Sequence, residues 1–183
     1  NKSVKTSKFL RFILNKKIFK IELSAGPYEK NILDKIIKFK KNIQIHNYFP
    51  VPRNPFIINL ASKDELIYKL SENHLKKSIN FTKKIGSKVF SFHAGFLVDP
   101  RVKDFGKTLS KFKTNNKSEV MKLYIYRLNR LADYAKKRGV ILLIENNVIT
   151  KKNLNRFDKN PFLMTNFSDT KKIMENTREN VGL

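Results

Sequence analysis

A short apolar run that ends in an acid and an amide decides the fold: residues 140–146 read VILLIEN. Five consecutive apolar residues are typical of a strand that is covered on both faces, as in a parallel sheet. The segment before this run carries Val120, Tyr124 and Leu128 on one face of a helical pattern. Gly139 separates the two elements, at a position where glycine commonly follows a helix end. This helix-then-strand unit predicts the α/β class.

The same unit occurs four times along the chain. Its apolar runs lie at residues 19–24, 43–48, 88–93 and 140–146, and each follows a helical pattern. Strands that alternate with helices pair in parallel through right-handed crossovers. We therefore expect about four adjacent parallel strands in chain order, with a helix between neighbours. The pattern fits a doubly wound sheet or a (β/α)8 barrel, and the single glycine in SAGP at residues 24–27 disfavours a nucleotide-binding doubly wound fold.

Residue spacing predicts two details of these units. Ser62 and Glu65 are spaced as a capping box, which would begin the third helix at this point. The apolar residues near the strand ends are expected to face the interior of the barrel. These residues are Ile21, Ile45, Phe92 and Ile144.

Composition limits the classes of protein that the chain can form. With 183 residues, of which 40% are hydrophobic, the chain is long enough for one domain with a core. The absence of cysteine excludes a disulfide scaffold, a cysteine zinc site and a thiol nucleophile. No apolar run approaches the ~18 residues of a membrane span. We therefore expect a single cytoplasmic domain, residues 1–183, with no membrane partner.

The strongly basic charge has two explanations. Lys and Arg number 39 against 15 Asp and Glu, and the resulting net charge of +24 is typical of proteins that bind nucleic acid. However, 31 of the 39 are lysines scattered along the chain, and lysine, asparagine and isoleucine are the residues of A- and T-rich codons. We therefore regard codon bias as the main source of the charge and nucleic acid as the less favoured partner.

Polar side chains stand where the four predicted strands end. In α/β sheets and barrels, ligands bind at the carboxyl ends of the strands. These ends are occupied by Glu22, His46, His93 and Glu145, which we expect to point into one cavity. Imidazole and carboxylate groups that converge from separate strands can hold a metal ion. We predict a metal or substrate site here, with Glu22 as a substrate-binding residue.

Weaker candidates lie in the loops and in one helix. Arg53 belongs to a loop with three prolines, and it either faces an anionic group such as phosphate or lies on a rigid surface loop. Asn146 and Asn147 either bind substrate hydroxyls or hydrogen-bond the turn after the strand. We assign Arg53 and Asn146 to substrate binding. His74, in the third helix, is predicted to be a surface or packing residue.

Four segments carry a resemblance to a known family. They read IELSAG at residues 21–26, IHNYFP at 45–50, FHAGF at 92–96 and LIENN at 143–147. Together they resemble the xylose isomerase-like TIM-barrel superfamily, which includes sugar phosphate isomerases and epimerases as well as endonuclease IV. The resemblance implies a (β/α)8 barrel whose first strand and last three strands are missing, so that the chain would be truncated at both ends.

The resemblance also implies roles for the strand-end residues. His46 and His93 match metal-ligand histidines of the endonuclease IV-like pattern, and Glu145 matches the glutamate that binds metal throughout the superfamily. In the epimerases this glutamate also transfers protons, which makes Glu145 the expected catalytic residue. The implied cofactor is a divalent metal (Mn, Mg, Co or Zn), with further ligands from strands beyond Leu183.

Two enzyme chemistries and one inactive alternative follow from the resemblance. In a sugar or sugar phosphate isomerase or epimerase, the C–H group beside a metal-bound carbonyl is acidified, and Glu145 or a carboxylate from the missing part of the barrel moves its proton. In an endonuclease IV-like enzyme, zinc-activated hydroxide cuts the phosphodiester beside an abasic site. The first is favoured, because Ala94 stands where the endonucleases have proline and Asn147 where they have threonine. The third alternative is a barrel fragment without catalysis.

An incomplete barrel is expected to have open edges. Closure removes sheet edges, whereas a partial barrel leaves backbone groups unpaired at its first and last strands. We therefore expect the 183-residue chain by itself to associate, as a homo-oligomer or an aggregate, and to lack isomerase activity.

Overall fold

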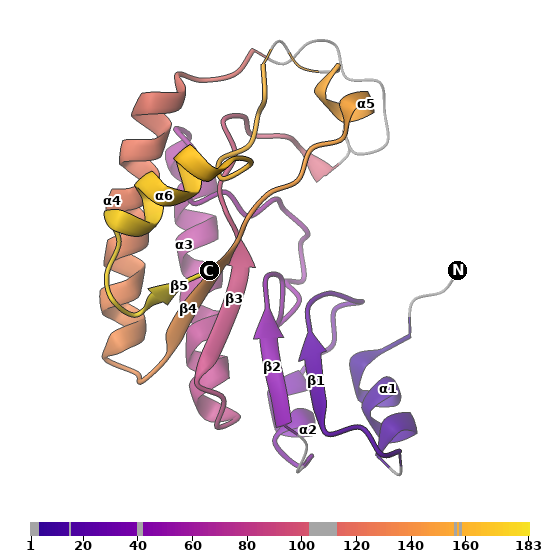
Figure 1. Ribbon diagram of the computed structural model, residues 1–183. Coiled ribbons are helices and arrows are strands. Elements are labelled where there is room, and N and C mark those ends of the chain that lie inside the picture. Colours follow the sequence, from indigo (N-terminus) through magenta and orange to yellow (C-terminus); the bar gives the residue numbers. More distant parts are fainter. Residues whose placement is uncertain (1–3, 15, 40–41, 103–112, 156, 158) are drawn as a thin grey trace.

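Five strands form one parallel sheet in the computed structural model (Figure 1). The structure describes residues 4–14, 16–39, 42–102, 113–155, 157 and 159–183. The spatial order of the strands follows the chain and every pairing is parallel, which confirms the four expected strands. A short fifth strand begins at Val181, where the family resemblance implies the start of the next barrel strand. The strands are β1 (Lys20–Leu23), β2 (Asn42–His46), β3 (Val89–His93), β4 (Ile141–Glu145) and β5 (Val181–Gly182).

Helices alternate with the strands. In chain order they are α1 (Thr6–Ile13), α2 (Ile32–Ile36), α3 (Glu65–Lys84), α4 (Lys117–Lys136), α5 (Lys151–Leu154) and α6 (Phe167–Glu175). In Figure 1 the arrows of β1, β2 and β3 point toward the same end of the molecule, where the long loops and α5 lie. Gly139 follows α4 with a φ of +68°, the left-handed conformation expected after a helix end. This alternation is that of a partial (β/α)8 barrel.

Successive residues of each strand face opposite sides of the sheet. Ile45, Phe92 and Ile144 are at most 1% exposed and belong to the hydrophobic core, where α3 and α4 pack against the sheet. Ile21, at 8% exposed, belongs to the same core. The prediction that these four side chains face the barrel interior is therefore wrong. The residue that follows each of them takes the opposite, concave face instead.

The start of α3 differs from the expected capping box. Its N-cap is Asp64, whose carboxylate accepts hydrogen bonds from the N–H groups of Leu66 at 2.8 Å and of the next residue at 3.2 Å. The predicted pairing of Ser62 with Glu65 is wrong, because the Ser62 hydroxyl donates a 2.8 Å hydrogen bond to Asp99 in the loop after β3. Ser62 therefore joins two loops rather than capping a helix.

A buried carboxylate fastens α1 to the segment before α2. Glu29 accepts hydrogen bonds from the Ser7 N–H at 3.1 Å, from the Ser7 hydroxyl, and from Lys35 Nζ at 2.7 Å. Burial by itself would raise the pKa of Glu29, but the bonds from Lys35 and Ser7 outweigh it and lower that pKa to about 2. The carboxylate is thus ionised in the folded protein.

We expect Glu29→Gln to destabilise the protein by roughly 1–3 kcal/mol near neutral pH, the usual contribution of hydrogen bonds to a charged group. Because the pKa of Glu29 is lower in the folded state than the ordinary value of 4.5, this stabilisation is complete above that value and is lost as the pH falls toward 2. Urea unfolding measured across this range should show the two proteins converging in acid.

The matched control is Glu175→Gln, because Glu175 forms an exposed pair with Lys171. An exposed pair of this kind contributes little to the free energy of unfolding. A difference between wild type and Glu29→Gln that stays constant down to about pH 2 contradicts the role given to Glu29.

Candidate metal centre

Two histidines and a glutamate meet at the carboxyl ends of β2, β3 and β4. His93 lies opposite Glu145 in the parallel ladder, and His46 lies opposite Ser91. Glu145 Oε1 is 3.5 Å from His46 Nδ1, and Glu145 Oε2 is 3.3 Å from His93 Nδ1. The two imidazole rings meet edge to face, with centroids 5.2 Å apart. One ligand atom from each of the three residues lies within 4.8 Å of the other two, which is close enough to share one ion.

The three side chains differ in their surroundings. His46 is buried, and its Nδ1 is 3.0 Å from the hydroxyl of buried Ser91, which holds the ring in place. The side chains of His93 and Glu145 are 43% and 46% exposed. Burial lowers the pKa of His93, the Glu145 carboxylate opposes this, and His46 adds to it. The net direction favours neutral imidazole, the form that binds metal ions.

This donor set fits a divalent cation. Imidazole nitrogen and carboxylate oxygen are ligands of Zn, Mn and Co, and Mg accepts the carboxylate. A catalytic metal site must also keep a position open for water or substrate. Here the exposure of His93 and Glu145 leaves one side of the cluster open.

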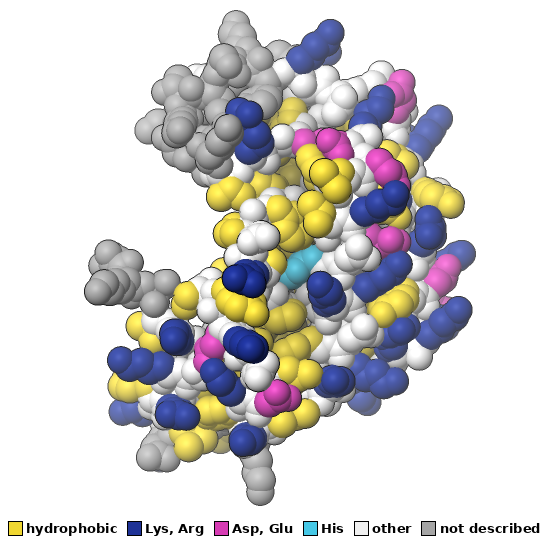
Figure 2. Space-filling view, turned by 180° about the vertical axis from the view of Figure 1, so that it is seen from behind, with side chains coloured by type: hydrophobic (Ala, Val, Ile, Leu, Met, Phe, Trp, Pro, Cys, Tyr) yellow, Lys and Arg dark blue, Asp and Glu magenta, His cyan; other side chains and the backbone are white. Residues whose placement is uncertain are grey.

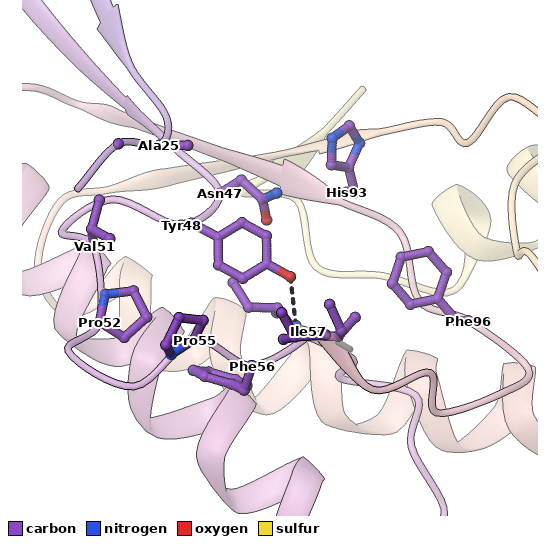
Figure 3. A pocket seen from close by; sticks show the side chains of 13 residues that line it. Ala25, Asn47, Tyr48, Val51, Pro52, Pro55, Phe56, Ile57, His93 and Phe96 are labelled. Atoms are coloured by element: carbon purple, nitrogen blue, oxygen red, sulfur yellow. Dashed lines mark hydrogen bonds between the residues drawn. The ribbon is translucent and has the colours of Figure 1, made fainter. Parts of the chain in front are cut away.

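A pocket of about 460 Å³ opens beside His93 (Figure 3). Its walls come from the turn after β1 and from the loops that follow β2 and β3. The Tyr48 hydroxyl accepts a 2.9 Å hydrogen bond from the Ile58 N–H, which fixes the tyrosine ring against one wall. This volume is in the range of small-molecule sites. The other aromatic lining residues are Phe56 and Phe96.

A sequence profile described as xylose isomerase-like TIM barrel matches residues 20–183. The chain belongs to this family. The matched region contains all five strands and the three residues of the cluster, and it confirms the resemblance seen in the sequence. No curated protein sequence matches the chain.

Solved structures of the xylose isomerase-like fold superimpose on nearly all of the chain. A D-tagatose 3-epimerase-like protein does so with a TM-score of 0.67 and 17% identity, over 95% of this chain and 58% of its own. An L-ribulose 3-epimerase gives 0.65 and 16%, over 98% and 56%. A xylose isomerase-like TIM barrel protein from Mycobacterium smegmatis, in complex with magnesium, gives 0.61 and 12%, over 97% and 54%. The chain thus spans just over half the length of these structures.

Glu22 lies apart from the cluster. It is exposed on β1 and pairs with Gln44, two residues before His46, which places it about 7 Å lower along the sheet. It borders a separate hollow that also contains Lys20 and Lys88. The expectation that Glu22 shares one cavity with the other strand-end residues is therefore wrong. β1 continues to Leu23, so Glu22 lies within the strand and below the rim.

Arg53 and Asn146 are both exposed, and neither lines the pocket. Their assignment to substrate binding stays a prediction. Asn147 takes the structural alternative, since its amide donates hydrogen bonds to the carbonyls of Ala94 at 3.1 Å and Leu163 at 3.0 Å. The loops after β3 and β4 are thereby joined.

His74 is a packing residue, as expected. It is 5% exposed, its ring packs against Tyr48 and Phe56, and its Nε2 is 3.3 Å from the Asn47 carbonyl oxygen. Burial, reinforced by Lys77 and opposed by the bond to Asn47, lowers the pKa of His74 to about 4. His74 is thus neutral near pH 7 and supports the pocket wall from behind.

A buried amide joins the two loops that wall the pocket. Asn59, 1% exposed, donates from Nδ2 to the Phe96 carbonyl at 3.2 Å and to Asp99 Oδ1 at 2.7 Å. The loops approach so closely that a Cβ at Gly95 would lie 2.5 Å from the Cβ of Ala61, so glycine is required there. Asn59 and Gly95 were not singled out from the sequence, because their function depends on contacts between distant segments.

We expect the chain to bind one Zn²⁺ or Co²⁺ at the cluster. His46→Ala should abolish binding, and Glu145→Gln should weaken it by tenfold or more, because each removes one of three donors. Isothermal titration and the visible absorption bands of bound Co²⁺ measure the effect. Glu22→Gln is the matched control, since it alters a strand-end carboxylate outside the cluster. Equal affinity in wild type and Glu145→Gln contradicts the assignment.

Proposed function

We propose that the chain carries part of the active site of a divalent-metal-dependent sugar isomerase or epimerase. The convergence of His46, His93 and Glu145 beside a small-molecule pocket supports this most strongly. The fold is shared with a D-tagatose 3-epimerase-like protein and an L-ribulose 3-epimerase. Because the chain spans just over half of such structures, the proposed activity is that of the whole protein in which the chain occurs.

His46, His93 and Glu145 would hold the metal, for which Mn, Mg, Co and Zn are the candidates. When bound, a divalent cation polarises the substrate carbonyl and lowers the barrier to removing the adjacent proton. Buried His46 is fixed by Ser91, so it provides a rigid side to the site. His93 lines the pocket that the substrate would enter, and the exposed Glu145 lies beside it.

Glu145 is the proposed proton carrier. Its carboxylate accepts the proton from the carbon beside the carbonyl, and the electron pair of the broken C–H bond moves to the carbonyl oxygen. A proton given to the opposite face of the same carbon yields the epimer, and it requires a second acid across the substrate from Glu145. Return of the proton from Glu145 to the former carbonyl carbon yields the isomer, with the hydroxyl proton of the neighbouring carbon moving to the former carbonyl oxygen. With one oxygen near each histidine, the carboxylate is oriented at the open side of the cluster.

An endonuclease IV-like activity is the second candidate, and the net charge of +24 favours it. Figure 2 shows Lys and Arg side chains spread over one face of the molecule among polar and hydrophobic ones, rather than gathered in one stripe. Within the pocket, the described lining includes no lysine or arginine to meet a phosphodiester. We therefore rank the sugar enzyme first. A barrel fragment without catalysis is the third alternative.

None of the described helices is long and apolar enough to cross a membrane. The cytoplasmic location and the single domain over residues 1–183 expected from the sequence stay predictions.

Solvent deuterium exchange tests the proposed function directly. In D₂O with Mn²⁺ or Mg²⁺, we expect the whole protein, expressed from its uninterrupted reading frame, to exchange the hydrogen beside the carbonyl of a ketohexose. Glu145→Gln should lower the rate by at least 10²-fold, the usual contribution of a general base. The 183-residue chain expressed by itself should be inactive.

The outcomes separate the three candidates. Metal-dependent exchange that is lost in Glu145→Gln but kept in Glu22→Gln supports the sugar enzyme. Cleavage of abasic DNA without any exchange contradicts it and supports the endonuclease. Neither reaction, with metal binding intact, supports the non-catalytic alternative.

A further inference from the structure

Asn47, the residue that follows His46 in the sequence, projects an unpaired side-chain amide into the pocket. Asn47 is 9% exposed, and its backbone is fully used: its N–H donates to the Ser91 carbonyl at 2.7 Å, and its carbonyl oxygen lies 3.3 Å from His74 Nε2. Its side-chain amide has no hydrogen-bond partner among the described residues. Figure 3 shows this amide between Tyr48 and His93, on the pocket wall.

This amide is not among the buried polar atoms left without a partner, so it is accessible from the pocket. A ligand that displaces its hydration must supply hydrogen bonds in return. An asparagine amide both donates and accepts. A sugar hydroxyl also donates and accepts, so the amide can pair with one hydroxyl or with two neighbouring hydroxyls.

The backbone holds this amide in a fixed direction. Asn47 has a φ of +46°, in the left-handed region that asparagine tolerates better than most residues. The bonds to Ser91 and His74 pin both sides of the peptide. Because Ser91 also holds the His46 ring, the amide and the proposed metal ligand are positioned by the same strand.

Apart from His93, the rest of the described pocket lining is largely apolar. The walls beside Asn47 are formed by Tyr48, Val51, Pro52, Phe56, Ile57 and Phe96. The Tyr48 hydroxyl is already bonded to the Ile58 N–H. The described lining contains no lysine, arginine or carboxylate. A phosphate bound here would lose its hydration without gaining the charged partner that phosphate sites provide.

We propose that Asn47 binds a hydroxyl of the substrate and that the apolar walls receive an uncharged end of it, remote from the reacting carbonyl, as in a deoxy sugar rather than a sugar phosphate. This inference rests on the proposed function and narrows its substrate class. The strongly basic surface of the protein does not extend to this pocket among the described residues.

Three ketohexoses that differ only at carbon 6 test the proposal: 6-deoxy-D-fructose, D-fructose and D-fructose 6-phosphate. Each is titrated into the whole protein, expressed from its uninterrupted reading frame, in the presence of Zn²⁺, with affinities from calorimetry and the site of binding from amide NMR shifts. We expect the deoxy sugar to bind about tenfold more tightly than D-fructose, because the apolar wall gains a methyl group in place of a hydroxyl. The phosphate should bind most weakly. Tightest binding of the phosphate, or no binding of any of the three, overturns the proposal.

Variants of Asn47 and of a neighbouring asparagine separate binding from folding. Asn47→Gly removes the amide and suits the left-handed backbone, so the fold should persist. We expect all three sugars to bind about five- to tenfold more weakly, the loss of one hydrogen bond. Asn54→Gly, exposed in the same loop, should leave affinity unchanged. Unchanged affinity in Asn47→Gly overturns the role given to Asn47.

A gain-of-charge variant tests the wall. Val102 lines the pocket and is 45% exposed, so Val102→Lys places a cation at the edge with little cost to folding. It should strengthen binding of the 6-phosphate by tenfold or more while leaving the deoxy sugar unchanged. Equal effects on both sugars contradict the proposal.

Zn²⁺ affinity, measured in the same experiments, keeps the two hypotheses apart. Zn²⁺ binding with preference for the phosphate overturns this inference and leaves the proposed function standing. The expected order of sugars with no metal bound at the cluster supports the inference and contradicts the proposed function.

Discussion

The parallel register between β3 and β4 places His93 opposite Glu145, and the site depends on this pairing. Strands that run in the same direction bring their carboxyl ends to one edge, so a polar residue that ends each strand meets its neighbour there. A shift of one residue in β4 would turn Glu145 toward the helices and place Ile144 or Asn146 opposite His93. The core residues Phe92 and Ile144, fully covered by helices, prevent that shift.

The pocket depends on a second constraint, the attachment of the loops to each other. Asn59 bonds the loop after β2 to the loop after β3, and Asn147 bonds the loop after β4 to the same segment. Gly95 lets these loops approach to a distance that any larger residue would prevent. Long loops at the rim are therefore held as walls, and His93 is presented to a space with a defined shape. A rigid wall of this kind favours selectivity in binding, because fewer rotamers must be ordered when a ligand enters.

The repeated helix-then-strand unit made the sheet and the convergence of His46, His93 and Glu145 predictable from sequence. The run at 140–146 and three similar runs identified parallel strands, and alternation then placed His46, His93 and Glu145 at one rim. The same reasoning failed for Glu22, because β1 continues to Leu23 and the stagger with β2 lowers Glu22 below the rim. Strand ends are decided by pairing with neighbours, which spacing within one strand does not reveal.

Features made by distant segments were beyond the sequence. The capping residue of α3 was misassigned because the Ser62 hydroxyl donates its hydrogen bond to Asp99, which is distant in the sequence. The orientation of Asn47 depends on Ser91 and His74, and its left-handed backbone has no signature in the residues beside it. Arg53 was predicted to bind substrate because it is the cation of the proline loop. The residues of that loop that line the pocket are instead the apolar Val51, Pro52 and Pro55.

The most direct test of the account is anomalous diffraction from crystals of the whole protein, expressed from its uninterrupted reading frame and soaked with Zn²⁺. The account predicts an anomalous peak about 2.0–2.2 Å from a nitrogen of His46, a nitrogen of His93 and an oxygen of Glu145. Zn²⁺ bound elsewhere on the chain, with His46, His93 and Glu145 still joined only to each other, would contradict it.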